Sequence, residues 1–312
     1  MKKKLVPVLT SAICASVLLT NGAFAETKEK VKADSKISVT ELNTIEKRHK
    51  EFDKIVQEQQ FYLNEINKNE AEFLSQEKVK TIKELSLNKQ NKLNEIDKEF
   101  RKLHKDNLDK KLEANGFIKV KNGDDEVTVF LDDPSDLVLT DNCYFDTRTQ
   151  KYVFLGMWDF RSPYDTKEAT WDIAAIRMNK NTYPIGNSSC YAYDNGGKMT
   201  GDTLNGASVS GSTTTKRFEN GYGVVYNIKD DTQKTTSGLQ IYATDHGQAS
   251  MYFDTVGTAG NKIFFDFEHN YSTDTLDVSA SFSGVNLTGS ALTVTYSDAE
   301  QSYRRTSNGR SL

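Results

Sequence analysis

Apolar residues follow two different periods along this chain. In the first part they recur three or four positions apart, in the series Leu42, Ile45, Phe52, Val56, Leu63, Ile66 and Phe73. A second series is displaced by two residues from that frame and consists of Val79, Ile82, Leu93, Ile96, Phe100 and Leu103. Such spacing is typical of an amphipathic helix with an imperfect heptad pattern. It predicts a long N-terminal helical segment, either one helix in a coiled coil or an antiparallel helical hairpin.

The helical segment has clear limits in the sequence. Ser38 and Glu41 match the Ser-x-x-Glu capping box, which places the start of the helix close to Val39. Residues 23–115 contain neither glycine nor proline, whereas all but one of the 19 glycines lie at or after Gly116. Glycine and proline interrupt helices and form tight turns, so this change predicts a domain boundary. We expect a disordered leader over 26–38, a helical segment over 39–115 and a second domain over 116–312.

A single helix across this segment would be much longer than a globular domain. At 1.5 Å per residue it would reach about 110 Å, and its apolar stripe would need a partner chain. The absence of glycine and proline favours this continuous rod, although the polar run from Ser86 to Asn91 is a plausible corner for a hairpin. The rod predicts a homo-oligomer formed through the helical segment.

The second domain alternates apolar and polar residues. Leu276, Val278, Ala280 and Phe282 fall on one face of an extended chain, with aspartate and serine between them, and a similar run follows at 292–297. About ten short runs separated by turn residues predict an all-β antiparallel domain, either a sandwich or a jelly roll. The whole chain is therefore expected to be a multidomain protein of α plus β class.

Residues 1–25 have the pattern of a secretory signal peptide. Three lysines precede a short apolar run, and Ala23-Phe24-Ala25 supplies small residues for cleavage. The run is shorter than the roughly 20 residues that a membrane-spanning helix needs. We expect a secreted, extracellular protein without a transmembrane anchor after signal cleavage.

Cys143 and Cys190 are the cysteines that remain after that cleavage. An oxidising exterior would allow one disulfide between them, and two free buried thiols are the equal alternative. Residues 116–312 carry 17 Lys and Arg against 25 Asp and Glu. This acidic surplus gives no long-range attraction for nucleic acid, so a nucleic-acid partner is not expected.

One pair of carboxylates has a spacing that suits hydrolysis. Asp266 and Glu268 stand two positions apart in a predicted strand and share one face, about 7 Å apart. Glycoside hydrolases use two carboxylates at a comparable separation. The alternative is a solvated strand face opposite an aromatic core, and the sequence favours it because no third acid continues the row.

Two further groups of residues suggest binding. The first is acidic and consists of Asp132, Asp133, Asp136 and Asp141, the type of ligand that calcium prefers; solvated turns are the alternative, and no other cofactor is indicated. The second consists of two same-face tyrosine pairs, Tyr191 with Tyr193 and Tyr222 with Tyr226. Aromatic faces pack against sugar rings, and core packing is the alternative.

Motifs of common enzyme classes are absent from the sequence. There is no Gly-x-Ser-x-Gly elbow, His-Glu-x-x-His, phosphate loop or dinucleotide fingerprint, and Asp245-His246-Gly247 has the composition of a turn. We expect an exported, non-enzymatic binding or surface-interaction protein, with a helical stalk and a β-sandwich that binds glycan or protein. The alternatives are a secreted glycoside hydrolase using Asp266 and Glu268, and a secreted helical toxin acting on membranes.

Overall fold

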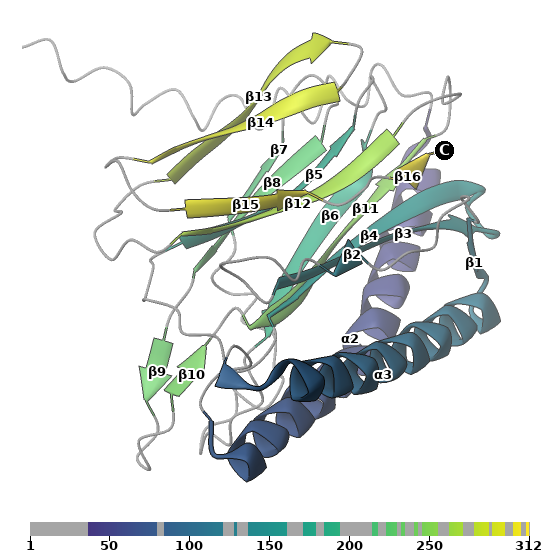
Figure 1. Cartoon of the computed structure of the whole chain (residues 1–312). Coiled ribbons are helices and arrows are strands. Elements are labelled where there is room, and N and C mark those ends of the chain that lie inside the picture. Colours follow the sequence, from purple (N-terminus) through teal and green to yellow (C-terminus); the bar gives the residue numbers. More distant parts are fainter. Residues whose placement is uncertain are drawn as a thin grey trace, which may run out of the picture. The chain divides into compact units, whose positions relative to one another are not determined.

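The chain folds into helices and antiparallel sheets (Figure 1). The computed structural model describes residues 37–79, 84–120, 128–129, 137–160, 171–178, 184–193, 214–217, 223–229, 232–234, 240–242, 245–254, 262–270, 278–286, 289–296, 302–306 and 310–311. Two compact units divide the chain, Met1–Leu42 and Asn43–Leu312. Within the described residues, no helix has the length and apolar character needed to cross a membrane. The predicted signal peptide lies outside the described residues.

Two helices occupy the segment for which one long N-terminal helix was the leading expectation. They are α2 (Val39–Glu77) and α3 (Leu87–Ala114). The amide of Glu41 donates to Ser38 Oγ over 3.1 Å, which confirms the predicted cap. After Glu77, Lys78 has a φ of 57°, in the left-handed region, and this ends the right-handed helix. The continuous rod is therefore wrong, because a lysine takes the helix-ending conformation that glycine usually supplies.

The two helices contact each other in opposite directions. Arg48, near the start of α2, donates through Nη2 to the carbonyl oxygen of Asn115, which follows α3, over 2.9 Å. Further along α2, the ring of Tyr62 lies 5.7 Å from that of His104 in α3. The earlier residue of α2, Arg48, contacts the end of α3, and the later residue, Tyr62, contacts an earlier position of α3. The two helices therefore run antiparallel.

Most described strands belong to two six-stranded antiparallel sheets. The first, called sheet A, contains in spatial order β1 (Phe117–Lys119), β3 (Leu137–Asp146), β4 (Lys151–Phe160), β11 (His246–Phe253) and β6 (Pro184–Tyr193), and β2 (Thr128–Val129) also pairs with β3. The second, sheet B, contains β15 (Ser302–Thr306), β12 (Lys262–Asn270), β5 (Trp171–Met178), β8 (Gly223–Lys229) and β7 (Thr214–Arg217), and β16 (Arg310–Ser311) also pairs with β12.

Two separate strand pairs complete the described structure. They are β9 (Thr232–Lys234) with β10 (Gln240–Tyr242), and β13 (Val278–Asn286) with β14 (Gly289–Tyr296). The second pair is antiparallel and covers most of the alternating residues that predicted strands over 276–297. Period-two alternation therefore located these strands correctly.

One hydrophobic core contains side chains from both large sheets. Trp158 of β4 stacks on Phe267 of β12, with ring centroids 4.9 Å apart, and also lies 6.3 Å from Phe265. A side chain on Gly156 would meet the ring of Phe265 at 2.2 Å, so the two sheets approach closely at this point. Because side chains alternate along a strand, every second residue of sheet A enters this core and the others point to the opposite face.

The apolar stripe of α2 packs on that opposite face of sheet A. Phe52 is fully buried, and its ring lies 5.1 Å from Phe117 of β1 and 5.6 Å from Tyr144 of β3. Ile45 and Val56, from the same predicted stripe, are also buried. The stripe that predicted a partner chain thus has a partner within the chain, because sheet A offers apolar side chains at its β1 and β3 edge.

Candidate functional site: the polar layer on sheet A

Polar side chains dominate the rest of the helix-facing side of sheet A. In β11, Ala249, Met251 and Phe253 enter the inter-sheet core, whereas His246, Gln248, Ser250 and Tyr252 alternate with them on the other side and are all buried. Together with the buried polar side chains of α2, α3, β3, β4 and β6 that surround them, we call these the polar layer. It contains three clusters of titratable groups.

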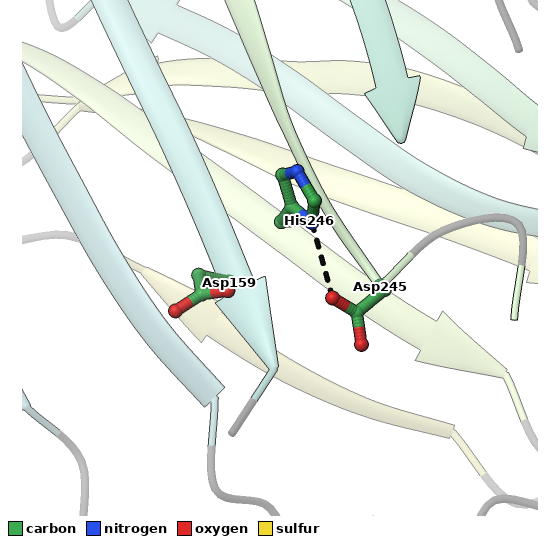
Figure 2. Close-up of side chains that lie close together, drawn as sticks. All are labelled: Asp159, Asp245 and His246. Carbon is green, nitrogen blue, oxygen red and sulfur yellow. Dashed lines mark hydrogen bonds and ion pairs between the residues drawn. The ribbon is translucent and has the colours of Figure 1, made fainter. Parts of the chain in front are cut away.

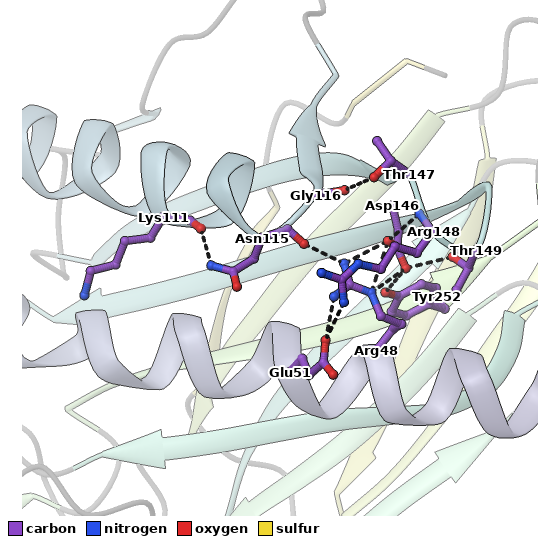
Figure 3. Close-up of polar contacts among 10 residues, drawn as sticks. All are labelled: Arg48, Glu51, Lys111, Asn115, Gly116, Asp146, Thr147, Arg148, Thr149 and Tyr252. Atoms are coloured by element: carbon purple, nitrogen blue, oxygen red, sulfur yellow. Dashed lines mark hydrogen bonds and ion pairs between the residues drawn. The ribbon is translucent and has the colours of Figure 1, made fainter.

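The first cluster is an ion pair between Arg48 of α2 and Asp146 of β3, which we call the Arg48 latch (Figure 3). Arg48 donates through Nε to both carboxylate oxygens over 3.2 Å and through Nη2 over 2.9 Å. Asp146 also accepts hydrogen bonds from the hydroxyls of Tyr252 and Thr149 and from the amide of Arg148, over 2.8–3.1 Å. Both latch side chains are buried, at 3% and 0% exposure. The latch therefore joins α2 to sheet A through charged groups removed from water.

The environment of the latch favours the charged forms of both partners. Burial alone would raise the pKa of Asp146, but the hydrogen bonds from Arg48 and Thr149 lower it below the usual value. Burial and the neighbouring carboxylate together raise the pKa of Tyr252. Its hydroxyl therefore stays protonated and donates a hydrogen bond to Asp146. The carboxylate is thus held ionised, and Arg48 is its counter-charge.

The second cluster contains the residue types of a hydrolytic triad in a different arrangement. Ser250 Oγ donates to Asp53 over 2.6 Å and lies 2.7 Å from His49 Nε2 and 2.8 Å from Ser189 Oγ. In a hydrolase the acid orients the far nitrogen of the histidine. Here Asp53 and His49 contact the same hydroxyl, and both are buried under α2. The cluster therefore holds α2 on β11 and β6 and gives a substrate no access to Ser250.

The third cluster is formed by Asp159, Asp245 and His246 (Figure 2). One possible ligand atom from each lies within 4.8 Å of the other two, and all three side chains are buried. His246 Nδ1 lies 3.0 Å from a carboxylate oxygen of Asp245. Arg101 of α3 forms an ion pair with Asp159, and its Nε also donates to both oxygens of Asp97 over 2.9 Å. Positive and negative groups thus meet where α3 crosses the end of β4.

A small cavity of about 30 Å³ lies beside this third cluster. Its wall includes Arg101, His104, Met157 and Asp159. His104 is 5% exposed, and neither ring nitrogen has a hydrogen-bond partner among the described residues. Burial, followed by the charges of Arg101 and His246, lowers the pKa of His104 to about 4. The imidazole is therefore neutral at pH 7 and offers a lone pair to the cavity.

Other buried polar atoms of the layer also lack partners among the described residues. They include both amide atoms of Gln59, both amide atoms of Asn142, the hydroxyl of Tyr193 and Nε2 of His246. An unsatisfied buried donor or acceptor costs about 1–3 kcal/mol. The helix-facing side of sheet A is therefore a less favourable interface than the apolar core on its other side.

The carboxylates of the predicted hydrolytic pair lie on sheet B. Asp266 of β12 is 1% exposed, accepts a hydrogen bond from Arg177 Nε over 2.6 Å and another from Thr306 Oγ1. Glu268 is also buried. Neither lines the small cavity, nor the larger one of about 260 Å³ between α2 and α3. The expectation of a solvated strand face at these two residues is wrong, because both are covered.

The structure describes three of the four tyrosines of the predicted sugar platform and places them on two different sheets. Tyr191 and Tyr193 lie on β6, where Tyr193 stacks on His246 with centroids 5.2 Å apart and Tyr191 bonds to Gln57 of α2. Tyr226 belongs to the inter-sheet core, so its assignment to a binding platform is wrong. Tyr222 lies outside the described residues. Within the described residues, therefore, the β6 pair keeps a place on a polar face.

The structure describes one of the four predicted calcium residues and both predicted disulfide cysteines. Asp132, Asp133 and Asp136 lie outside the described residues, and Asp141 is buried within strand β3 rather than in a loop. Cys143 and Cys190 are both buried, and neither forms a disulfide. They lie on β3 and β6, three strand spacings or about 14 Å apart, far beyond the reach of a disulfide. The disulfide alternative is therefore wrong for this fold, and the alternative of two buried cysteines without a disulfide is confirmed.

No known protein-family model matches this chain, and a search of curated proteins finds no match either.

Proposed function

We propose that this protein is an exported, non-enzymatic binding protein whose two large sheets form a β-sandwich of jelly-roll type. In this proposal the ligand surface is the polar side of sheet A. The shared core of sheets A and B supports the sandwich, because antiparallel sheets that bury one common set of side chains are packed face to face. The other side of sheet A is then a large outer face that the core does not use.

The observation that carries this proposal is the pairing of β6 with β11. Tyr193 stands opposite His246 and Tyr191 stands opposite Gln248 in the antiparallel register. Two phenol rings, an amide and an imidazole therefore form a compact grid on one face. Such a grid combines flat aromatic surfaces with donors and acceptors for hydroxyl groups, the chemistry that recognises a neutral glycan. We propose a neutral glycan as the ligand.

The helices α2 and α3 act in this proposal as a cover over that face. Gln57 of α2 bonds to Tyr191, so the grid is engaged by the helix when the cover is closed. In the closed state Tyr193, Asn142 and Gln59 have polar atoms without a partner among the described residues, and a polyhydroxylated ligand would satisfy those on sheet A. Opening would also expose the apolar stripe of α2, which a second copy could cover as in the predicted coiled-coil oligomer.

A glycan-binding assay with three variants tests this function. The wild-type chain, Arg48→Met, Tyr191→Ala and Tyr62→Ala are incubated with insoluble neutral polysaccharides and with a glycan array. Arg48→Met removes one half of the latch and should increase the bound fraction several-fold. Tyr191→Ala should reduce glycan binding, because the aromatic ring on which a sugar would stack is lost. Tyr62→Ala is the matched control, since Tyr62 lies on α2 against His104 and is outside the grid.

Two results would contradict the proposal. One is the absence of neutral-glycan binding by both wild type and Arg48→Met while circular dichroism shows that they are folded. The other is equal loss of binding in Tyr191→Ala and Tyr62→Ala. Capture of a protein through the same grid would replace the glycan by a protein ligand, the other partner class that the sequence allowed.

A further inference from the structure

The cluster of Asp159, Asp245 and His246 is held by the rigid part of sheet A. His246 stands directly opposite Asp159 in the pairing of β11 with β4, and Asp245 precedes His246 in the chain. The backbone of Phe160 donates to the carbonyl oxygen of Asp245 over 2.8 Å and fixes that residue beside the strand end. Three oxygen and nitrogen donors therefore converge from neighbouring backbone positions. Among the described residues, this is the place where three such donors lie within 4.8 Å of one another.

A second observation points to a ligand at this place. His104 of α3 and Asp159 line the same small cavity, and neither ring nitrogen of the buried His104 has a hydrogen-bond partner in the part of the chain that the structure describes. His246 is fully buried; its Nδ1 lies 3.0 Å from Asp245, and its Nε2 has no hydrogen-bond partner among the described residues. A buried imidazole nitrogen without a partner is unfavourable, and a metal ion is one of the few groups that satisfies it without a proton.

We propose that Asp159, Asp245 and His246 bind a divalent transition-metal ion, with His104 as the fourth ligand. Two carboxylates and two imidazoles form a tetrahedral donor set that suits Zn²⁺. Bonds of about 2.0–2.2 Å place tetrahedral donors about 3.4 Å apart, so the donors of Asp159, Asp245 and His246, which lie within 4.8 Å of one another, would close by side-chain rotation. His104 would approach them through the small cavity that it lines together with Asp159. Ca²⁺ and Mg²⁺ prefer six or more oxygen ligands and fit this set poorly.

The arginine beside the cluster is compatible with a bound cation. Arg101 pairs with Asp159 and is also held by both oxygens of Asp97. A carboxylate has two oxygens, so Asp159 can bind Arg101 with one and the metal with the other. Asp97 then balances the charge of Arg101, and the charges of Asp159 and Asp245 balance that of the metal.

The ligands come from two parts of the fold. His104 belongs to α3, whereas Asp159, Asp245 and His246 belong to sheet A and its margin. A bound ion would therefore cross-link α3 to sheet A at the end of the interface far from the Arg48 latch. His246 also belongs to the grid of the glycan proposal, but the metal site does not rest on that proposal, and Zn²⁺ binding is measured without glycan.

Metal analysis of the full chain, prepared without a polyhistidine tag, tests the site. The protein is treated with EDTA, incubated with Zn²⁺ and separated from free metal by gel filtration. We expect one Zn²⁺ per chain, a rise in melting temperature of several degrees when Zn²⁺ is far above its Kd, and visible absorption bands with Co²⁺. Fewer than about 0.1 Zn²⁺ per chain, with a melting temperature that neither Zn²⁺ nor EDTA changes, would overturn the proposal.

Three variants distinguish this site from adventitious binding. His246→Gln should weaken Zn²⁺ binding at least about 100-fold, and His104→Gln at least about 10-fold. His269→Gln is the matched control, because His269 is also buried with Nδ1 2.8 Å from Asp172, yet belongs to no group of three donors within the described residues. It should keep full Zn²⁺ binding. Equal binding by all three variants would overturn the site, and if His246→Gln does not fold, His104→Gln against His269→Gln decides.

Discussion

The two faces of sheet A bury different kinds of side chains. On one face, Trp158 stacks on Phe267 and the buried side chains are almost entirely apolar. On the other face, Arg48, Asp146 and His104 are buried together with polar atoms that have no partner among the residues that the structure describes. Apolar burial is favourable without directional demands, whereas buried charge is favourable only where its partners are complete. The first face should therefore determine the fold, and the second should be where the structure opens.

The largest effect should come from the apolar face. Trp158→Ala removes a fully buried indole between the two sheets and should lower the free energy of unfolding by about 4 kcal/mol. Urea unfolding followed by far-UV circular dichroism measures this. A loss below about 1 kcal/mol would mean that the two sheets do not share this core.

The latch should give the next largest effect. Asp146→Ala leaves Arg48 buried without its main counter-charge and should cost about 3 kcal/mol. The double variant Arg48→Met/Asp146→Leu removes both charges and should recover most of that loss, because an apolar pair of similar volume replaces a buried ion pair with little change. If the double variant is as unstable as Asp146→Ala, packing rather than charge pairing holds this contact.

The polar layer should also make stability depend on pH. The pKa of His104 is lowered from 6.5 to about 4 by folding, so the unfolded chain takes up its proton first. The contribution of the neutral His104 ring to the free energy of unfolding is complete above pH 6.5. It falls as the pH decreases toward 4, by up to about 3 kcal/mol. Urea unfolding in EDTA over this range should show a shallower pH dependence for His104→Gln than for wild type. Parallel curves would show that His104 is not buried as a neutral ring.

The smallest expected effect is an increase in stability from a substitution of Gln59. Gln59 is 1% exposed and both of its amide atoms lack partners among the described residues. Gln59→Met keeps the volume and removes the unsatisfied amide, so it should stabilise the protein by about 1 kcal/mol. Val56→Thr, a polar change at an apolar position of the same helix, is the control and should destabilise. A loss of stability in Gln59→Met would show that the amide is satisfied.

The sequence predicted the elements better than their assembly. Three-four spacing located the helices, and alternation located strands such as β13 and β14. The sequence left the rod and the hairpin open, with Ser86 to Asn91 as a possible corner, and it favoured the rod because Lys78, rather than glycine, adopts the left-handed conformation after α2. The spacing of apolar residues also could not say whether the stripe of α2 packs on another helix or on a sheet, since both need the same amphipathic face.

The candidate site was largely beyond the reach of the sequence. Asp245-His246-Gly247 has a turn composition, but His246 begins β11 and meets Asp159, 87 positions earlier, only through strand pairing. Arg48 and Asp146 are joined in the same way by the fold. Such residues have no local motif, because the contacts that define them are long-range. The tyrosine pair of β6 was found, since alternation places both on one face.

Native-state hydrogen exchange tests the difference between the two faces of sheet A most directly. In EDTA, the amides of α2 and α3 should exchange through an opening that costs several kcal/mol less than the opening that exposes β4, β11 and β12. Arg48→Met should lower the protection of the helices while leaving that of the inter-sheet core strands unchanged. Equal protection of helices and core strands, reduced together by Arg48→Met, would show one cooperative unit and contradict a cover that opens separately.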